Sequence, residues 1–214
     1  CTACNLGVRR AASGYDVMHG SGTRGRIMFV MGYPGRMEEA TGNRFGGDGG
    51  TLLSALLDVI GLHEHSYFTY VVSCRSCTPD QDPATGAPRL RRQYGGVMLP
   101  VYNDLPPTDV QVDACRERLL REVYLVDPVL VVALGAPAIS ALVGKRVTVN
   151  SVQGIPQEIT VPGEGFTPRL TEKKRAWGRR VAGKMQYPVD PAPVRYLMLP
   201  TFDPTYVKMH EQDM

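Results

Sequence analysis

Five cysteines are the residues of this chain whose spacing most directly suggests chemistry. Cys1 and Cys4 form one close pair, C-T-A-C, and Cys74 and Cys77 form a second, C-R-S-C. Cys115 stands alone near the expected start of a helix. The count is odd and no secretory feature is visible, so disulfides are disfavoured. Ligation of a metal ion or an inorganic cluster is the better interpretation of such close pairs, with scattered buried thiols as the alternative.

A glycine-rich loop is the second stretch that is able to do chemistry. It follows Ile27 to Met31, an apolar run typical of a buried parallel strand. The chain turns through Pro34 and Gly35 and then crosses a polar, glycine-rich stretch that carries one exposed aromatic residue, Phe45. A helix is expected from about Thr51, with that threonine as its N-cap. In open α/β sheets, ligands bind in the loops beyond the carboxyl ends of the strands. We therefore expect a flat ligand to approach the backbone of this loop.

Length and composition are those of a single globular domain. The 214 residues fit one domain, 1–214, with inserted loops at about 78–110 and 163–193. A hydrophobic content of 43% is enough for a core, and no apolar run approaches the roughly 20 residues of a membrane span. No signal peptide is visible, so we expect a soluble, cytoplasmic protein without a membrane partner. The chain opens on Cys1, which fits a fragment or a processed form.

Strands and helices are expected to alternate along the chain. Cys1–Gly25 is expected to form loops at the sheet edge, and Pro79–Pro107 a long loop with a short hairpin near Val97–Tyr102. The pattern predicts a three-layer α/β/α sandwich around a mostly parallel four-stranded sheet. The remaining expected elements are strands at Tyr67–Val72, Val129–Gly135 and Tyr196–Leu199, short strands within Val147–Val161, and helices at Val112–Val126 and Ala136–Val143.

A basic segment precedes the last expected strand. Residues 169–184 carry seven lysines and arginines against the single acid Glu172, a local net charge of +6, whereas the whole chain carries only +3. Clustered basic side chains bind phosphates, and an aromatic residue among them stacks on an unpaired base. A solvated surface loop is the alternative. The predicted DNA contacts are Lys173, Lys174, Arg175, Trp177, Arg179 and Arg180.

The order of these motifs resembles the iron-sulfur (family-4-type) uracil-DNA glycosylases. The resemblance covers nearly the whole chain and implies that family's α/β fold and DNA as a partner. The stretches that carry it are CTAC at 1–4, IMFVMGYPGRMEEATGNRFGGDGGTLL at 27–53, YFTYVVSCR at 67–75, DACRERL at 113–119, DPVLVVALG at 127–135 and LPTFDPTY at 199–206.

The resemblance implies a [4Fe-4S] cluster. In the family, a C-x-x-C near the N-terminus, a cysteine closing the second strand and a cysteine opening the next helix are the ligands, which correspond here to Cys1, Cys4, Cys74 and Cys115. Cys77 is the alternative to Cys74, but the match to the family's V-V-x-C-R favours Cys74. The cluster is expected to contribute folding energy by joining distant segments.

The resemblance also implies a base pocket whose polar residues have been exchanged. The family's first loop reads Gly-Glu-Ala-Pro-Gly, with the Glu acting on water, and that Glu is Gly32 here. The family's uracil-reading Asn corresponds to Tyr70, and its His after the last strand to Asp203. Phe45 is expected to stack on a flipped base, with packing onto the core as the alternative. The expected pocket comprises Gly32, Tyr33, Pro34, Gly35, Phe45 and Tyr70.

These exchanges leave several functions open. An ionised Asp203 would repel the charge that develops on the leaving base, and a protonated one needs a raised pKa, so ordinary uracil excision is not expected. Asp203 could instead orient water or stabilise the cationic sugar, whereas Glu38 and Glu39 are expected to face solvent. The hypotheses are a base glycosylase of altered specificity with Asp203 as catalytic carboxylate, an inactive DNA-binding module of a replication or repair assembly, and an enzyme acting on modified nucleotides.

Overall fold

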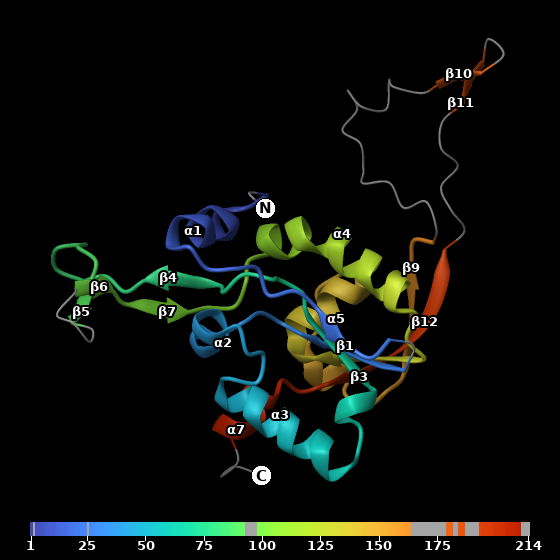
Figure 1. Ribbon diagram of the computed structural model, residues 1–214, viewed down its shortest axis with the longest axis horizontal. Coiled ribbons are helices and arrows are strands. Elements are labelled where there is room, and N and C mark those ends of the chain that lie inside the picture. Colours follow the sequence, from blue (N-terminus) through green and yellow to red (C-terminus); the bar gives the residue numbers. More distant parts are fainter. Residues whose placement is uncertain are drawn as a thin grey trace.

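The centre of the fold is a six-stranded mixed sheet. The computed structural model describes residues 1, 3–24, 26–92, 98–163, 179–181, 184–186 and 193–210. The order across the sheet is β1-β3-β2-β8-β12-β9, and Figure 1 shows the sheet in the middle of the molecule. The strands are β1 (Ser21–Gly22), β2 (Ile27–Met31), β3 (Ser66–Tyr70), β8 (Leu130–Leu134), β9 (Gln157–Val161) and β12 (Val194–Thr201).

The four central strands are parallel, as the sequence predicts, and the two edge strands are antiparallel. β2 pairs with β3 and β8, and β8 pairs with β12, all in parallel register. β1 and β9 run antiparallel to β3 and β12. The prediction of four strands is therefore wrong, because the sheet also contains these two edge strands. β1 has only two residues, both exposed, and β9 is buried on one side only, so neither carries the continuous apolar run of a central strand.

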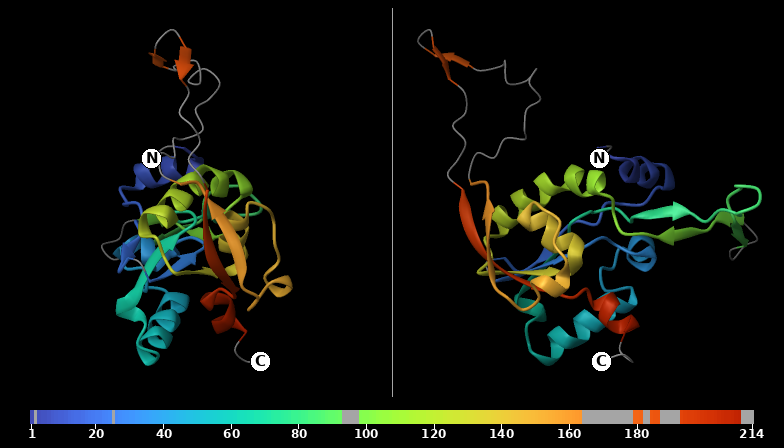
Figure 2. Two further views of the ribbon diagram at one scale, coloured as in Figure 1. Left: turned by 90° about the vertical axis from the view of Figure 1, so that its right-hand side faces the viewer. Right: turned by 180° about the vertical axis from the view of Figure 1, so that it is seen from behind.

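Helices cover both faces of the sheet, which makes three layers (Figures 1 and 2). Within β2, Met28 and Val30 point to one face and Phe29 to the other, because side chains alternate along a strand. The first face packs against α1 (Asn5–Ser13), α4 (Asp109–Val126) and α5 (Gly135–Val143), and the second against α3 (Asp48–Val59). The predicted α/β sandwich is confirmed. The shorter helices are α2 (Arg36–Thr41), α7 (Pro204–Met209), η1 (His63–His65) and η2 (Val149–Ser151).

Two helix starts differ from the prediction. Helix α1 occupies part of the segment that was expected to form loops, with Cys4 at its N-cap and Gly14 in the left-handed conformation after its end. Helix α3 begins at Asp48 behind Gly47, three residues before the predicted start. Thr51 is not the cap, because its hydroxyl donates to the Gly47 carbonyl oxygen at 2.9 Å inside the first turn.

A two-stranded arm replaces most of the long loop predicted at Pro79–Pro107. β4 (Cys77–Pro79) pairs with β7 (Tyr102–Asp104), and farther out β5 (Leu90–Arg92) pairs with β6 (Met98–Pro100), both antiparallel. Figures 1 and 2 show this arm projecting from the body of the protein. The hairpin expected near Val97–Tyr102 begins earlier in the chain, because β6 pairs with β5 at Leu90–Arg92. Proline usually argues against a strand, so the proline-rich sequence here predicts a loop. At the ends of strands in a two-stranded arm, however, proline costs no hydrogen bond between the strands, and the arm can form.

The predicted DNA-binding segment lies largely outside the described residues. Lys173, Lys174, Arg175 and Trp177 are not described, and neither are the side chains of Arg179 and Arg180. What is described of the segment is a short antiparallel pair, β10 (Arg179–Val181) with β11 (Lys184–Gln186). None of the helices in the described part of the chain has both the length and the apolar content to cross a bilayer.

Candidate active site

A cavity of about 50 Å³ lies where β2, β3 and β12 reach their carboxyl ends. This is the edge of a parallel sheet at which ligands bind in open α/β folds. Segments from six parts of the chain meet there: the ends of β2 and β3, helix α2, the loop between α2 and α3, helix α3, and the segment that leads from β12 into α7. The lining residues are Met31, Gly32, Tyr33, Glu38, Arg44, Gly49, Gly50, Leu53, Tyr70, Asp203, Pro204 and Thr205.

Two tyrosines form one side of this cavity. Tyr70, at the end of β3, is 2% exposed, and its hydroxyl donates to the carbonyl oxygen of Arg44 at 3.3 Å. Burial raises the pKa of Tyr70, the nearby carboxylates of Glu38 and Asp203 raise it further, and Arg44 acts in the opposite direction. Burial also raises the pKa of Tyr33, with Asp203 among the contributing charges. Both hydroxyls therefore stay protonated at neutral pH and present hydrogen-bond donors.

Asp203 enters the cavity from the loop after β12. It is the N-cap of α7, and its Oδ1 accepts a hydrogen bond from the Thr205 amide at 2.8 Å. Gly135 lies against it with a φ of +81°, and a Cβ on that residue would come within 3.0 Å of the Asp203 Cβ. Because a side chain at residue 135 would be both strained and crowded, a glycine there lets the Asp203 loop approach the start of α5.

Glu38 also lines the cavity, so the prediction that it faces solvent is wrong. Its side chain is half-buried, and its Oε1 accepts a hydrogen bond from the Gly47 amide at 3.1 Å. The residue stands at the third position of α2, behind a Gly35 N-cap. An acidic residue three positions after a helix cap commonly turns back toward backbone amides. This position was the local signal in the sequence that indicates an inward orientation of Glu38.

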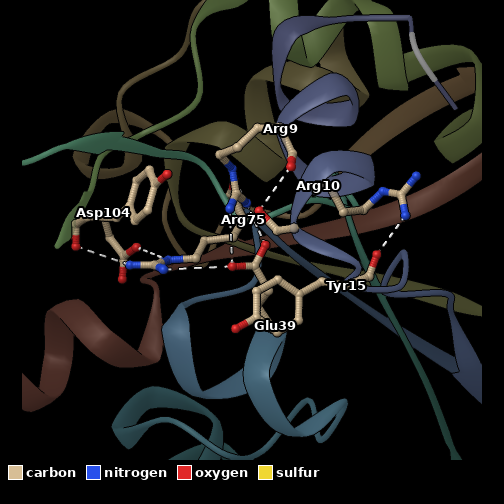
Figure 3. A network of polar contacts seen from close by, with 8 residues as sticks. Arg9, Arg10, Tyr15, Glu39, Arg75 and Asp104 are labelled. Atoms are coloured by element: carbon tan, nitrogen blue, oxygen red, sulfur yellow. Dashed lines mark hydrogen bonds and ion pairs between the residues drawn. The ribbon is translucent and has the colours of Figure 1, made fainter. Parts of the chain in front are cut away.

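Glu39 is buried in an ion network, which also corrects the prediction of a solvent-facing residue. Its side chain is 5% exposed, with Oε1 2.5 Å from Arg9 Nη2 and Oε2 3.7 Å from Arg75 Nη1. Arg75 Nε in turn donates to Asp104 Oδ1 at 2.5 Å. Figure 3 shows these side chains converging from α1, α2, the segment after β3 and the root of the arm. The network therefore joins four segments beside the cavity.

The other expected pocket residues are divided between the cavity and its surroundings. Gly32, Tyr33 and Tyr70 line it, whereas Pro34, Gly35 and Phe45 are not among the lining residues. Pro34 is buried and Gly35 adjoins Glu38. Phe45 is partly buried and packs edge-on against Phe68 and His63, with ring centroids 5.1 and 5.0 Å away.

Three of the five cysteines lie in one region. Cys4 at the start of α1 and Cys115 in α4 pack against the buried cluster that contains Cys74. Burial raises the pKa of the Cys74 thiol, Arg10 lowers it, and the neighbouring Cys115 and Cys4 raise it. Cys77 has different neighbours. Burial raises the pKa of its thiol, and Arg9 and Arg75 oppose that rise. Cys1 is exposed.

Comparison with known proteins assigns the family. A family model described as the uracil DNA glycosylase superfamily matches residues 19–214. The chain belongs to the uracil-DNA glycosylase superfamily. Superfamily members have an α/β fold, in agreement with the parallel sheet and flanking helices described above.

The similarity within the superfamily is to the type-4 group. The chain is 34% identical over 159 residues to a type-4 uracil-DNA glycosylase of Thermotoga maritima, a match that covers 73% of this chain and 68% of that protein. It is 30% identical over 113 residues to a type-4 uracil-DNA glycosylase of Archaeoglobus fulgidus, covering 52% of this chain and 44% of that protein. The predicted resemblance to family-4-type uracil-DNA glycosylases is confirmed.

The cysteines of this uracil-DNA glycosylase superfamily member suit an iron-sulfur cluster by their chemistry. Iron-sulfur clusters are held by thiolates, and Cys4, Cys74 and Cys115 approach one another beside the positive charge of Arg10. Within the described residues, no three histidine, cysteine, aspartate or glutamate side chains are already arranged to hold a single metal ion. The donor set therefore fits the cluster, while the ligating geometry stays a prediction.

Proposed function

We propose that this superfamily member is a DNA-base glycosylase of altered specificity. It would hydrolyse the N-glycosidic bond of a base that is flipped out of the DNA stack, as enzymes acting on bases in DNA must do. The observation that carries the proposal is the cavity at the carboxyl edge of the sheet, in which Tyr33, Tyr70 and Asp203 come together. Ordinary uracil excision is not expected, because the family's three polar catalytic positions are Gly32, Tyr70 and Asp203 in this chain.

The proposed pocket would read a base through hydroxyl groups. Tyr33 would offer a donor to its edge and Tyr70 an acceptor oxygen, because the Tyr70 hydroxyl already donates to the Arg44 carbonyl oxygen. Phe45 would stack on the face of the base once its ring leaves the contacts with Phe68. A cavity of about 50 Å³ holds roughly three to five waters. A pyrimidine base has more heavy atoms than that, so side chains of the pocket must move to admit it. Asp203 would act as the catalytic carboxylate, orienting water or stabilising the positive sugar.

Single-turnover cleavage assays test this proposal. Oligonucleotides carrying uracil, hypoxanthine or modified pyrimidines are incubated with excess protein, and abasic sites are then quantified. We expect one of the altered bases to be released and uracil to be a poor substrate. Asp203→Ala should abolish release. Asp203→Asn, which keeps an oxygen able to accept from the Thr205 amide, tests whether the charge or the helix cap is needed. Release that survives both substitutions would remove Asp203 from the reaction.

We also propose that Cys1, Cys4, Cys74 and Cys115 hold a [4Fe-4S] cluster. The convergence of three of these thiols from α1, the segment after β3 and α4 supports it. The cluster would supply structural cross-linking of those segments rather than redox chemistry. Iron and sulfide content of anaerobically purified protein, with the visible absorbance of such a cluster, tests the assignment. Removal of the cluster that left the thermal unfolding temperature unchanged would contradict the structural role.

DNA contact by the basic segment is a further part of the proposal. Each phosphate that a lysine or arginine neutralises adds about 0.9 to the slope of log affinity against log salt for duplex DNA. Replacing Lys173, Lys174 and Arg175 by alanine should therefore lower that slope by as much as roughly 3. A slope that does not change would assign these residues to a solvated loop.

A non-catalytic DNA-binding module of a replication or repair assembly is the second candidate. It is favoured by the loss of all three polar positions and by Tyr70, whose hydroxyl already donates to the Arg44 carbonyl instead of facing the cavity unpaired. The assays above separate the two functions. Salt-sensitive DNA binding without release of any base would favour the module.

A further inference from the structure

The carboxylate of Glu38 is held in a space between two glycines at the cavity. Its Oε1 accepts a hydrogen bond from the Gly47 amide at 3.1 Å. A Cβ on Gly47 would lie 2.5 Å from Oε1, and a Cβ on Gly35 would lie 2.7 Å from Oε2. Any side chain at either position would therefore displace the carboxylate. The two glycines thus leave room for a carboxylate from α2, the helix that follows the loop in which Gly32 stands at the position of the family's acid.

The loop before α3 orients this carboxylate. The Gly47 amide donates to its Oε1 at 3.1 Å, and the residue stands in the first turn of α2. Among the described residues, no hydrogen bond is made to Oε2. One oxygen is therefore fixed by the loop, and the other remains available to a water molecule or a substrate at the cavity.

We propose that Glu38 is a catalytic residue that supplies the carboxylate missing from position 32. This inference rests on the proposed glycosylase function. As the C1′–N bond breaks, its electron pair leaves with the base, which takes up a proton from solvent water, and the sugar becomes positively charged. Glu38 stabilises that charge and accepts a proton from the water whose oxygen bonds to C1′, and it then releases this proton to solvent. The products are the free base and an abasic sugar with a C1′ hydroxyl group.

The position of Glu38 separates its role from that of Asp203. Glu38 comes from the first turn of α2, which follows the loop that contains Gly32, and both residues line the cavity. Asp203 comes from the loop after β12 and caps α7. Both carboxylates line the same cavity. Two carboxylates on different elements allow both to face the positive sugar, while only Glu38 accepts the proton of the attacking water.

Analogue binding tests Glu38 without relying on turnover. Two oligonucleotides are compared, one with a cationic pyrrolidine in place of the target sugar and one with a neutral tetrahydrofuran. Wild type should bind the cationic analogue more tightly, and Glu38→Gln should reduce that preference on the order of ten- to a hundredfold. Glutamine keeps an oxygen that can accept from Gly47, so the loop stays in place. Asp48→Asn removes an exposed charge from the start of α3 and serves as the matched control.

The outcomes are decisive for Glu38 and for the function separately. A wild type without preference for the cationic analogue, or Glu38→Gln with unchanged preference, overturns the assignment. If wild type releases a base and Glu38→Gln does so at the same rate and with the same pH profile, the glycosylase stands and the role of Glu38 falls. If the preference is lost in Glu38→Gln but wild type releases nothing, Glu38 contacts the sugar of bound DNA, but the glycosylase function falls and the catalytic role of Glu38 falls with it. If the Gln variant folds poorly, Glu38→Asp replaces it. Asp keeps the negative charge but moves it away from the cavity by one methylene group, so this variant should show an intermediate preference for the cationic analogue.

Discussion

Neutralising Glu39 should destabilise the protein more than any change to a surface ion pair. Glu39 faces two arginines, Arg9 with a side chain 16% exposed and Arg75 with one 7% exposed. Asp104 also pairs with Arg75, but its side chain is 39% exposed. Replacing Glu39 by glutamine therefore leaves two largely buried guanidinium groups with one partly solvated acid. The network loses the charge that balances it.

The size of the effect follows from burial. Removing one partner of a buried ion pair costs about 3–5 kcal/mol, because the remaining charge is left desolvated without compensation. The total free energy of unfolding of a natural domain is about 5–15 kcal/mol. For a urea m-value of about 3 kcal/mol per molar, the upper end for small proteins, the midpoint of unfolding should fall by roughly 1 M or more. The exposed pair Glu158–Arg195 should contribute less than about 1 kcal/mol.

Urea unfolding followed by circular dichroism measures both changes under the same conditions. Glu39→Gln should lower the midpoint strongly, and Glu158→Gln should leave it nearly unchanged. The double variant Glu39→Gln with Arg9→Gln should lose less than the sum of the single variants, because the second change removes an unpaired charge. If Glu39→Gln and Glu158→Gln shift the midpoint equally, the network does not hold α1 and α2 together as the contacts indicate.

Three further changes test other parts of the structure. Burial raises the pKa of Tyr196 to about 12, and its hydroxyl donates to an Asp127 oxygen at 3.1 Å. Its contribution to stability should be complete below about pH 10 and lost as pH rises toward 12, so Tyr196→Phe should flatten the alkaline fall in unfolding free energy, and parallel curves would contradict this. Cys74→Ser should lose bound iron while Cys77→Ser retains it, and iron analysis giving the reverse order would exchange the two ligands. Gly49→Ala should lower stability by about 1–3 kcal/mol, because its Cβ would lie 2.2 Å from the Thr205 hydroxyl oxygen. An unchanged unfolding temperature would contradict the close packing of α3 on α7.

The parallel core and the family could be predicted because their signals are local. Ile27–Met31 and Leu130–Leu134 are continuous apolar runs followed by glycine, and such runs indicate buried parallel strands without knowledge of their partners. The three stretches that contain cysteines and the loop after β2 occur in a specific order along the chain. Edge strands β1 and β9 and the arm lack such runs, because one or both of their faces meet solvent.

The ion network and the position of Glu38 could not be predicted with the same ease. Glu39 meets Arg9 and Arg75 only after α1, α2 and the segment after β3 pack together, and nothing in the local sequence marks these distant partners. Charged residues are exposed by default, and burial is the exception that requires a partner. Helix α1 was missed for a related reason. Its two adjacent arginines, Arg9 and Arg10, are typical of a solvated loop, and the sequence does not show which groups they contact.

Release of a free base from DNA is the most direct test of the proposed glycosylase. DNA containing a broad mixture of damaged and modified bases is incubated with the protein, and the soluble fraction is analysed by mass spectrometry while abasic sites are counted in the polymer. We expect one class of base in solution and an equal number of abasic sites, both absent with Asp203→Ala. DNA that binds in a salt-sensitive manner but yields neither a free base nor an abasic site would contradict the glycosylase and leave a DNA-binding module.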